Sequence, residues 1–431
     1  TDDPRKESDN MIPLFEVIVN EVPPPKGDDE APLQILFSNI DYDEYVGRIG
    51  VGRVERGRVK LGQNVVLCCQ DGTTKNAKIS KLYQFDGLVR KEIKEASVGD
   101  IISVSGIADL NIGDTACDPA TIDPLEFVKI DEPTVSMMFM VNNSPFAGRE
   151  GKYVTSRNIR DRLMKEIRTN VALRVEDTES ADAFKVSGRG ELHLSILIET
   201  MRRENYEFQV SRPKVITKTV DGVLHEPMEI LMIEVPDAYV GPVMEKLGPR
   251  RAELVNMVTL DTGVTHLEFK IPARGLMGYR SEFLTDTNGN GIMSHVFDCY
   301  EPYKGEIVSR SQGSLIAYET GTTTAYGLFS AQDRGRLFVG AGVKVYEGMI
   351  VGASSKAEDI VVNVCKKKHI TNMRASGSDE MLKLTPPSIM SLEQSLEFIS
   401  DDELVEVTPE SIRIRKVILN KEQRMKRNAK K

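Results

Sequence analysis

A cluster of cationic and hydrogen-bonding side chains occupies residues 365–378, which read CKKKHITNMRASGS. Lysine supplies a point charge that attracts phosphate, and arginine and asparagine can also read sugar and base edges. No aromatic residue is interleaved, so base stacking is not indicated. The segment predicts contact with a nucleic-acid backbone, with a solvated hairpin loop as the alternative. Its candidate binding residues are Lys366, Lys367, Lys368, His369, Thr371, Asn372 and Arg374.

Three arginines near expected helix starts are further candidate phosphate ligands. Arg274 and Arg280 flank a predicted strand-to-helix junction, and Arg149 precedes a helix predicted over residues 155–169. The first turn of a helix carries unpaired N–H groups that favour anions. We therefore add these three arginines to the predicted nucleic-acid-binding residues, with exposure to water alone as the alternative.

Three segments match nucleotide-binding motifs only in part. The loop 148–152, GREGK, has Phe146 and Tyr153 where a phosphate-binding loop needs glycine and serine or threonine. The glycines of GRIGVG, residues 47–52, lie between expected strands with no helix after them. Residues 420–423, NKEQ, lack the aspartate of a guanine-specificity motif. The sequence therefore predicts no nucleotide site and no cofactor in this chain.

Glu191 and His193 are the residues that a hydrolase could use as an acid–base pair. Both lie in the first turn of a helix predicted over residues 191–203, where neighbouring positions point in different directions. No serine or cysteine nucleophile is marked out beside them, and the helix dipole explains a glutamate at this place. A structural role is predicted for both, with a free-standing hydrolase as the alternative.

Composition is that of a water-soluble globular protein with several domains. The 431 residues are 40% hydrophobic and 28% charged, and no run of about 18 apolar residues predicts a membrane span. The five cysteines form no C-x-x-C pair, which argues against zinc and disulfides and favours a reducing cytoplasm. The formal net charge of −9 argues against indiscriminate binding to nucleic acid.

Charge is nevertheless segregated along the chain. Residues 1–44 and 391–410 are acidic, whereas residues 413–431 carry nine lysines and arginines against Glu422 alone. Two interpretations of this basic tail stay open, a frayed solvated end and a phosphate-binding arm.

The pattern of strands and helices predicts several domains. Residues 32–117 alternate short apolar strands with glycine turns, as in a small closed β-barrel. Residues 133–211 show the order βαββαβ of a ferredoxin-like unit, and residues 228–300 repeat that order. From residue 304 onward the chain is again rich in predicted strands, including TTAYGLFS. One helix there follows Ser391, which with Gln394 forms a capping box.

Long segments of the chain resemble translational GTPases. The segment SGRGELHLSILIETMRRE, residues 187–204, is similar to the third domain of elongation factor G, and residues 226–257 and 271–303 are similar to its fifth domain. NNSPFAGREGKYVTSR, RASG and LEFISDDELVEVTPESIRIRK resemble the BipA/TypA family of these GTPases. The chain is thus identified as a member of that family, represented by a fragment without the GTPase domain.

The resemblance implies five parts. Residues 1–28 would be the end of the missing GTPase domain and a linker, and residues 29–122 a β-barrel. Residues 131–217 and 226–302 would be two ferredoxin-like domains. Residues 303–431 would be a β-rich, family-specific C-terminal domain with a basic tail. The fold class is therefore multidomain α+β and β.

The resemblance also implies a function. The parent would be a cytoplasmic GTP hydrolase of large-subunit assembly and stress adaptation, with GTP and Mg²⁺ bound by the missing domain and none by this fragment. The partners would be the 70S ribosome, rRNA and A-site tRNA, reached through the cationic loop, with no membrane and with a monomeric chain. A fragment of the related factor LepA and a protein-binding scaffold with acidic surfaces are the alternatives.

Overall fold

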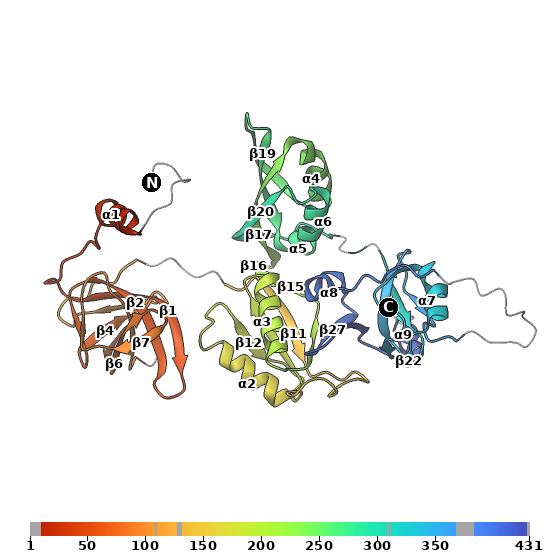
Figure 1. The fold of residues 1–431 in the computed structure, drawn as a ribbon, viewed down its shortest axis with the longest axis horizontal. Helices are drawn as coiled ribbons and strands as arrows, with labels where there is room; N and C mark the ends of the chain where they lie inside the picture. Colours follow the sequence, from red (N-terminus) through yellow and green to blue (C-terminus); the bar gives the residue numbers. More distant parts are fainter. Residues whose placement is uncertain are drawn as a thin grey trace, which may run out of the picture. The chain divides into compact units, whose positions relative to one another are not determined.

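The computed structural model describes residues 10–107, 110–126, 132–307, 310, 312–367 and 383–428. The chain divides into two compact units, Thr1–Ile130 with Arg168–Val171, and Asp131–Ile167 with Ala172–Lys431. Figure 1 shows the order of the elements along the chain. The first is helix α1 (Ile12–Glu21), whose side chains are all exposed. None of the helices described is both long and apolar enough to cross a membrane.

The first unit is built on an eight-stranded antiparallel sheet with the order β5-β4-β10-β1-β2-β9-β6-β7. A two-stranded sheet of β3 and β8 accompanies it. One core holds the unit together, with Ile35, Phe37, Val54, Leu82 and Val104 fully buried. The predicted β-barrel part of the fold is thus confirmed as strand-rich. Its strands are β1 (Gln34–Asp43), β2 (Gly47–Arg56), β3 (Val59–Lys60), β4 (Asn64–Cys68), β5 (Thr74–Lys78), β6 (Lys81–Asp86), β7 (Val89–Glu92), β8 (Glu95–Ala96), β9 (Ile101–Ser105) and β10 (Thr115–Cys117).

The second unit begins with the predicted βαββαβ order, which we call the first module. Its strands pair in the order β12-β13-β11-β14, and buried residues of α2 and α3 pack on the sheet. Thr155 and Ser391 cap α2 and a later helix through capping boxes, so the predicted box at Ser391 is confirmed. The elements of the module are β11 (Val135–Met140), α2 (Ser156–Glu166), β12 (Arg174–Asp177), β13 (Ala183–Gly188), α3 (Glu191–Arg203) and β14 (Phe208–Ser211).

The sheet of the first module continues into the C-terminal part of the chain. Strand β14 pairs with β27 (Glu403–Val407), and the sheet goes on through β28 (Ile412–Lys416) and β25 (Met349–Ser354). Eleven strands share this sheet, the others being β15 (Lys214–Val215), β21 (Ser314–Ala317), β23 (Gly335–Leu337) and β26 (Ile360–Val362). The first module and the C-terminal part therefore share one continuous backbone ladder.

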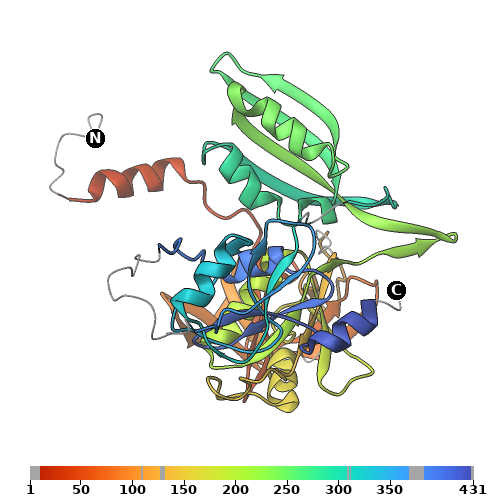
Figure 2. The same cartoon turned by 90° about the vertical axis from the view of Figure 1, so that its right-hand side faces the viewer.

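The second βαββαβ order forms the second module. Its central strand β17 (Val223–Pro236) pairs with β16 (Lys218–Val220), β19 (Val264–Pro272) and β20 (Ile292–Pro302), and β19 also pairs with β18 (Glu253–Thr259). Figures 1 and 2 show helices α4 (Val240–Leu247) and α6 (Tyr279–Asp286) on one face of this sheet. Their side chains Val243, Leu247, Tyr279 and Phe283 share its core. A 3-10 turn η1 (Asp237–Tyr239) precedes α4, and α5 (Ala273–Leu276) precedes α6.

One expectation about the C-terminal part was wrong. The segment TTAYGLFS forms helix α7 (Ala325–Gln332) rather than a strand, because Thr324 caps it and Leu328 and Ala331 are buried. Of the two interpretations left open for the basic tail, its described residues disfavour the frayed end, since Arg413 and Lys416 lie in β28 and residues 421–428 form helix α9 (Lys421–Asn428). The remaining elements are α8 (Leu392–Phe398) and the strand pair β22 (Gly321–Thr322) with β24 (Lys344–Val345).

Candidate nucleic-acid interface

The first described residues of the predicted cationic segment lie beside the start of α7. After β26, the carbonyl of Val364 accepts the backbone N–H of Thr324 at 2.9 Å. The Thr324 hydroxyl donates to the carbonyl of Lys366 at 2.5 Å and accepts the N–H of Gly327 at 3.0 Å. A Cβ on Gly327 would lie 2.4 Å from the Val364 carbonyl oxygen, so only glycine permits this approach. Residue 366 is therefore held by the first turn of α7.

The two lysines at the start of the loop face water. Lys366 and Lys367 are exposed, and neither forms an ion pair with the described residues. The Lys366 ammonium lies 5.8 Å from the centre of the Tyr326 ring, which adds a weak cation–π contact. Their charges are thus available to an external anion. Lys368, His369, Thr371, Asn372 and Arg374 lie outside the described residues, and their role stays a prediction.

Arg274 is engaged inside the second module. Its guanidinium pairs with Glu226, which is fully buried, and also donates to the carbonyl of Gly305. The ring of Tyr303 lies 4.2 Å from the guanidinium carbon. Neutralising a buried carboxylate is a sufficient structural reason for an arginine here. The structure thus gives Arg274 internal partners, and its contact with nucleic acid remains a prediction.

Arg149 and Arg280 are exposed, and the described residues offer neither of them an ion pair. Arg149 donates to the carbonyl of Pro145 at 3.1 Å and stacks 4.4 Å from the centre of the Phe146 ring. Arg280 is in the first turn of α6, after Gly278 in the left-handed region at φ 71°. Because Arg149 and Arg280 belong to different elements, they remain separate candidate phosphate contacts.

The glycine loop of the first module binds a carboxylate of the chain itself. The backbone N–H groups of Gly148 and Gly151 donate to the two carboxylate oxygens of Glu207 at 2.7 and 2.9 Å. Glu207 is fully buried, and Asn142 also donates to it at 2.8 Å. The amides that a nucleotide phosphate would need are therefore already occupied, in agreement with the missing motif residues.

Sequence reasoning missed a buried network that joins this loop to the C-terminal strands. Glu406 of β27 is fully buried and accepts hydrogen bonds from Asn142, Ser144 and Tyr346 at 2.8–2.9 Å. Arg413 pairs with Glu406 at 3.1 Å and with Glu150 of the loop. Only the acidic and basic residue types were visible in the sequence, because the loop residues lie more than 250 positions from their partners in β27 and β28.

The surroundings of Glu191 and His193 do not favour the hydrolase alternative. Burial, together with the carboxylates of Glu397 and Glu393, raises the pKa of Glu191 to about 7. Burial lowers the pKa of His193, whose Nδ1 accepts the backbone N–H of Arg189 at 3.4 Å. The Ser195 hydroxyl donates to the backbone carbonyl of Glu191 at 3.0 Å, so it is engaged within the helix.

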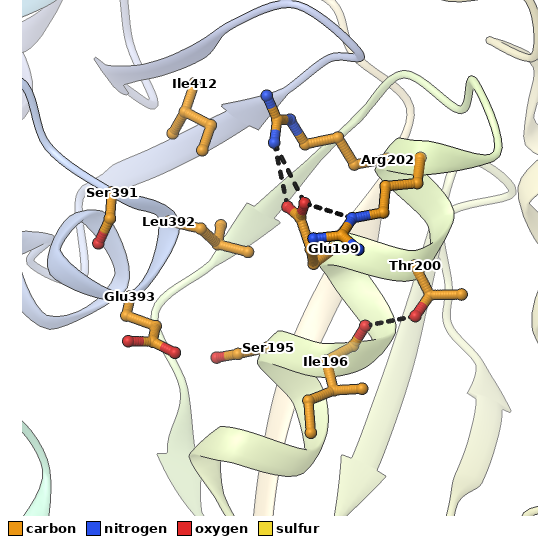
Figure 3. A pocket seen from close by; sticks show the side chains of 10 residues that line it. Ser195, Ile196, Glu199, Thr200, Arg202, Ser391, Leu392, Glu393 and Ile412 are labelled. Carbon is orange, nitrogen blue, oxygen red and sulfur yellow. Dashed lines mark hydrogen bonds and ion pairs between the residues drawn. The ribbon is translucent and has the colours of Figure 1, made fainter.

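A groove of about 620 Å³ lies next to this helix (Figure 3). Glu199 pairs with Arg202 and Arg203 at 3.1 and 2.9 Å, and Thr200 donates to the carbonyl of Ile196 at 2.8 Å. These polar groups therefore satisfy one another within α3. No group of three or more His, Cys, Asp or Glu suited to a metal ion occurs among the described residues.

Comparison with known proteins first defines a class. Residues 47–117 match the family Elongation factor Tu domain 2, and residues 223–311 match Elongation factor G C-terminus. The chain is thus built from the domains of translation factors, as the fold class predicted. Residues 312–421 match the family TypA/BipA C-terminal domain.

The relatives narrow this class to one family. A Bacillus subtilis protein described as "Large ribosomal subunit assembly factor BipA" is 52% identical over 100% of this chain and 70% of its own length. Proteins of the same description from Synechocystis and Salmonella typhimurium are 53% and 52% identical, over 96% and 98% of this chain and 70% of their own lengths. The chain belongs to the BipA family, which confirms the resemblance and disfavours the LepA alternative.

Proposed function

We propose that this chain is the ribosome-binding part of a BipA-type factor that serves assembly of the large ribosomal subunit and adaptation to stress in the cytoplasm. The descriptions of its relatives as large-subunit assembly factors support this proposal. The parent protein hydrolyses GTP, and we assign GTP, Mg²⁺ and hydrolysis to residues other than these. In support of this assignment, the glycine loop that ends in Gly151 and Lys152 holds Glu207 instead of a phosphate.

Contact with RNA is assigned to the C-terminal domain. The observation that carries this proposal is the pair of exposed lysines, Lys366 and Lys367, on a backbone held by Thr324 of α7. Phosphate contacts from these lysines and from the cations that follow them in the sequence supply affinity. The partners are the rRNA of the 70S ribosome and the A-site tRNA, met by a monomeric chain.

Co-sedimentation with 70S ribosomes tests this assignment. Replacing Lys366, Lys367, Lys368 and Arg374 with alanine removes four cations, and we expect the affinity to fall roughly tenfold or more. The described side chains among them are exposed, so unfolding should not accompany the loss. The matched control replaces four other exposed lysines, Lys91, Lys165, Lys246 and Lys356, which form no ion pair with the described residues. Equal affinity of the two variants would remove the loop from the proposal.

A further inference from the structure

A second cationic site lies between α9 and the end of the long sheet. A pocket of about 710 Å³ opens here, and α9 is visible beside the C-terminal label in Figures 1 and 2. Its wall is formed by α9, the strand end after β28, the turn at residues 400–402 and Arg212 after β14. Three aspartates and five cations are among its lining residues. The ion pairs that they form therefore decide whether the net charge of the pocket is positive or negative.

The acidic residues of the pocket already have partners. The Lys416 ammonium lies 2.6 Å from Asp359 and 3.0 Å from Asp402, and only 2% of this lysine side chain is exposed. Asp401 pairs with Lys214 at 3.1 Å. Lys416 also lies 2.9 Å from Glu403. The charge of Asp401 is thus offset by Lys214, whereas Asp359 and Asp402 share Lys416 and keep part of their negative charge.

The other cations of the pocket have no such partners. Arg212, Lys421, Arg424 and Arg427 line it, and the described residues provide no ion pair for any of them. Positions 421, 424 and 427 are spaced by three, which places them on neighbouring lines of one helix face, spread over about 9 Å of the axis. Lys426 lies on the other side of α9 and does not line the pocket. The site therefore carries an excess of positive charge.

Arg424 gives independent evidence that the pocket takes an acceptor. Its Nη1 donates to the carbonyls of Ile418 and Leu419, whereas its Nη2 is buried and has no hydrogen-bond partner among the described residues. A buried donor without a partner costs about 1–3 kcal/mol. Because Arg424 lines the pocket, an oxyanion bound there would lie near a donor that no described residue satisfies.

We propose that this pocket binds phosphate groups of RNA, an inference that rests on the proposed function of the chain as an RNA-binding body. The three cations of α9 span enough length for more than one phosphate of a strand. The carboxylates of Asp401 and Asp402 also line the pocket, and their oxygens are acceptors for a ribose 2′-hydroxyl. A strand that carries both phosphates and 2′-hydroxyls therefore fits the mixed lining of the pocket.

The test is filter binding of purified large-subunit rRNA to the full chain. The variant Lys421→Gln with Arg427→Gln removes two exposed cations from the pocket and keeps Arg424, which also holds the backbone. We expect roughly tenfold weaker binding and a slope of log K against log salt smaller in magnitude by about 1.4–1.8. The matched control, Lys165→Gln with Lys426→Gln, removes the same charge outside the pocket and should leave the slope close to that of the wild type.

Each outcome has a separate meaning. A pocket variant that binds like the control would overturn the phosphate site and leave the proposed function intact. A wild-type chain that binds neither rRNA nor ribosomes would overturn the proposed function and the pocket with it. A single-stranded uridine oligomer should compete better than its deoxy counterpart, and equal competition would contradict the choice of RNA as the ligand.

Discussion

The two βαββαβ modules have the same order of elements but treat their last strand differently. In the first module, β14 pairs on one side with β11 and on the other with β27 of the C-terminal part. In the second module, β20 pairs with β17, and no other strand of the described residues pairs with β20. The sheet of the first module is thus extended by strands of the C-terminal part. Among the described residues, the sheet of the second module is not extended in this way.

The side chains of the two last strands, β14 and β20, agree with this difference. Phe208, Gln209 and Val210 of β14 are buried, so this strand is sequestered on both faces. Strand β20 carries charged residues near its end, including Asp298 and Glu301, and both pair with Lys270 at 2.8 and 2.6 Å. Charges on an edge strand discourage further pairing. The residues of the last strand, and not the order of elements, therefore decide whether a further strand pairs with the module.

The largest expected effect comes from removing a buried carboxylate at the shared sheet. Glu406→Ala leaves Arg413 with one carboxylate fewer and removes the acceptor of Asn142, Ser144 and Tyr346. Breaking a buried pair from one side costs about 3–5 kcal/mol. We expect this loss in the free energy of unfolding measured by urea titration, with faster hydrogen exchange in both β14 and β27.

The variant Glu226→Ala makes the corresponding change in the second module. It leaves the guanidinium of Arg274 without its buried partner, but every group that it disturbs lies in residues 223–311. Hydrogen exchange should therefore speed up in β17 and β20 and remain unchanged in β27. Exchange that rises equally in both modules after either substitution would contradict the division between a shared sheet and a separate one.

A change of pH is expected to have a smaller effect on the free energy of unfolding. The group responsible is Glu191 of the first module. Glu191 titrates near 4.5 when unfolded and at about 7 in the fold, because burial and the carboxylates of Glu397 and Glu393 disfavour its charged form. Between these values the folded chain holds a proton that the unfolded chain has released. The contribution of Glu191 to the free energy of unfolding is therefore fully present below about pH 4.5. It is lost as the pH rises to about 7.

Replacing Glu191 with glutamine should abolish this loss. Relative to the wild type, Glu191→Gln should gain on the order of 2–3 kcal/mol at pH 8 and little at pH 4.5. Urea titrations at the two pH values give the numbers. The variant Glu245→Gln, at an exposed position of α4 in the second module that forms no ion pair with the described residues, serves as the control for removing a surface charge. A gain independent of pH would point to packing instead of titration.

Local signals allowed much of the fold to be predicted. The apolar spacing in residues 191–203 predicted α3 with its observed bounds, and the capping box at Ser391 predicted α8. Helix α7 could not be predicted, because the threonines that precede it and its tyrosine and phenylalanine favour strands. The helix is supported by the Thr324 cap and by buried residues such as Gly327, which packs against Val364, 37 positions further along the chain.

The candidate site was harder to predict than the fold. The types of the cations were visible in the sequence, but their pairing was not. Arg413 and Lys416 counted as part of a basic tail, and the fold neutralises them with Glu150, Glu406, Asp359 and Asp402. Lys366 and Lys367 look the same in composition and remain unpaired among the described residues. Only a three-dimensional arrangement separates cations that balance the fold from cations left for a ligand.

The most direct test of the RNA-docking account is the salt dependence of ribosome binding by the wild-type chain. Phosphate contacts release counterions, so the logarithm of the affinity should fall linearly with the logarithm of the salt concentration. We predict that the affinity for 70S ribosomes falls roughly a hundredfold or more between about 50 and 200 mM salt. An affinity that stays constant over this range would contradict the account.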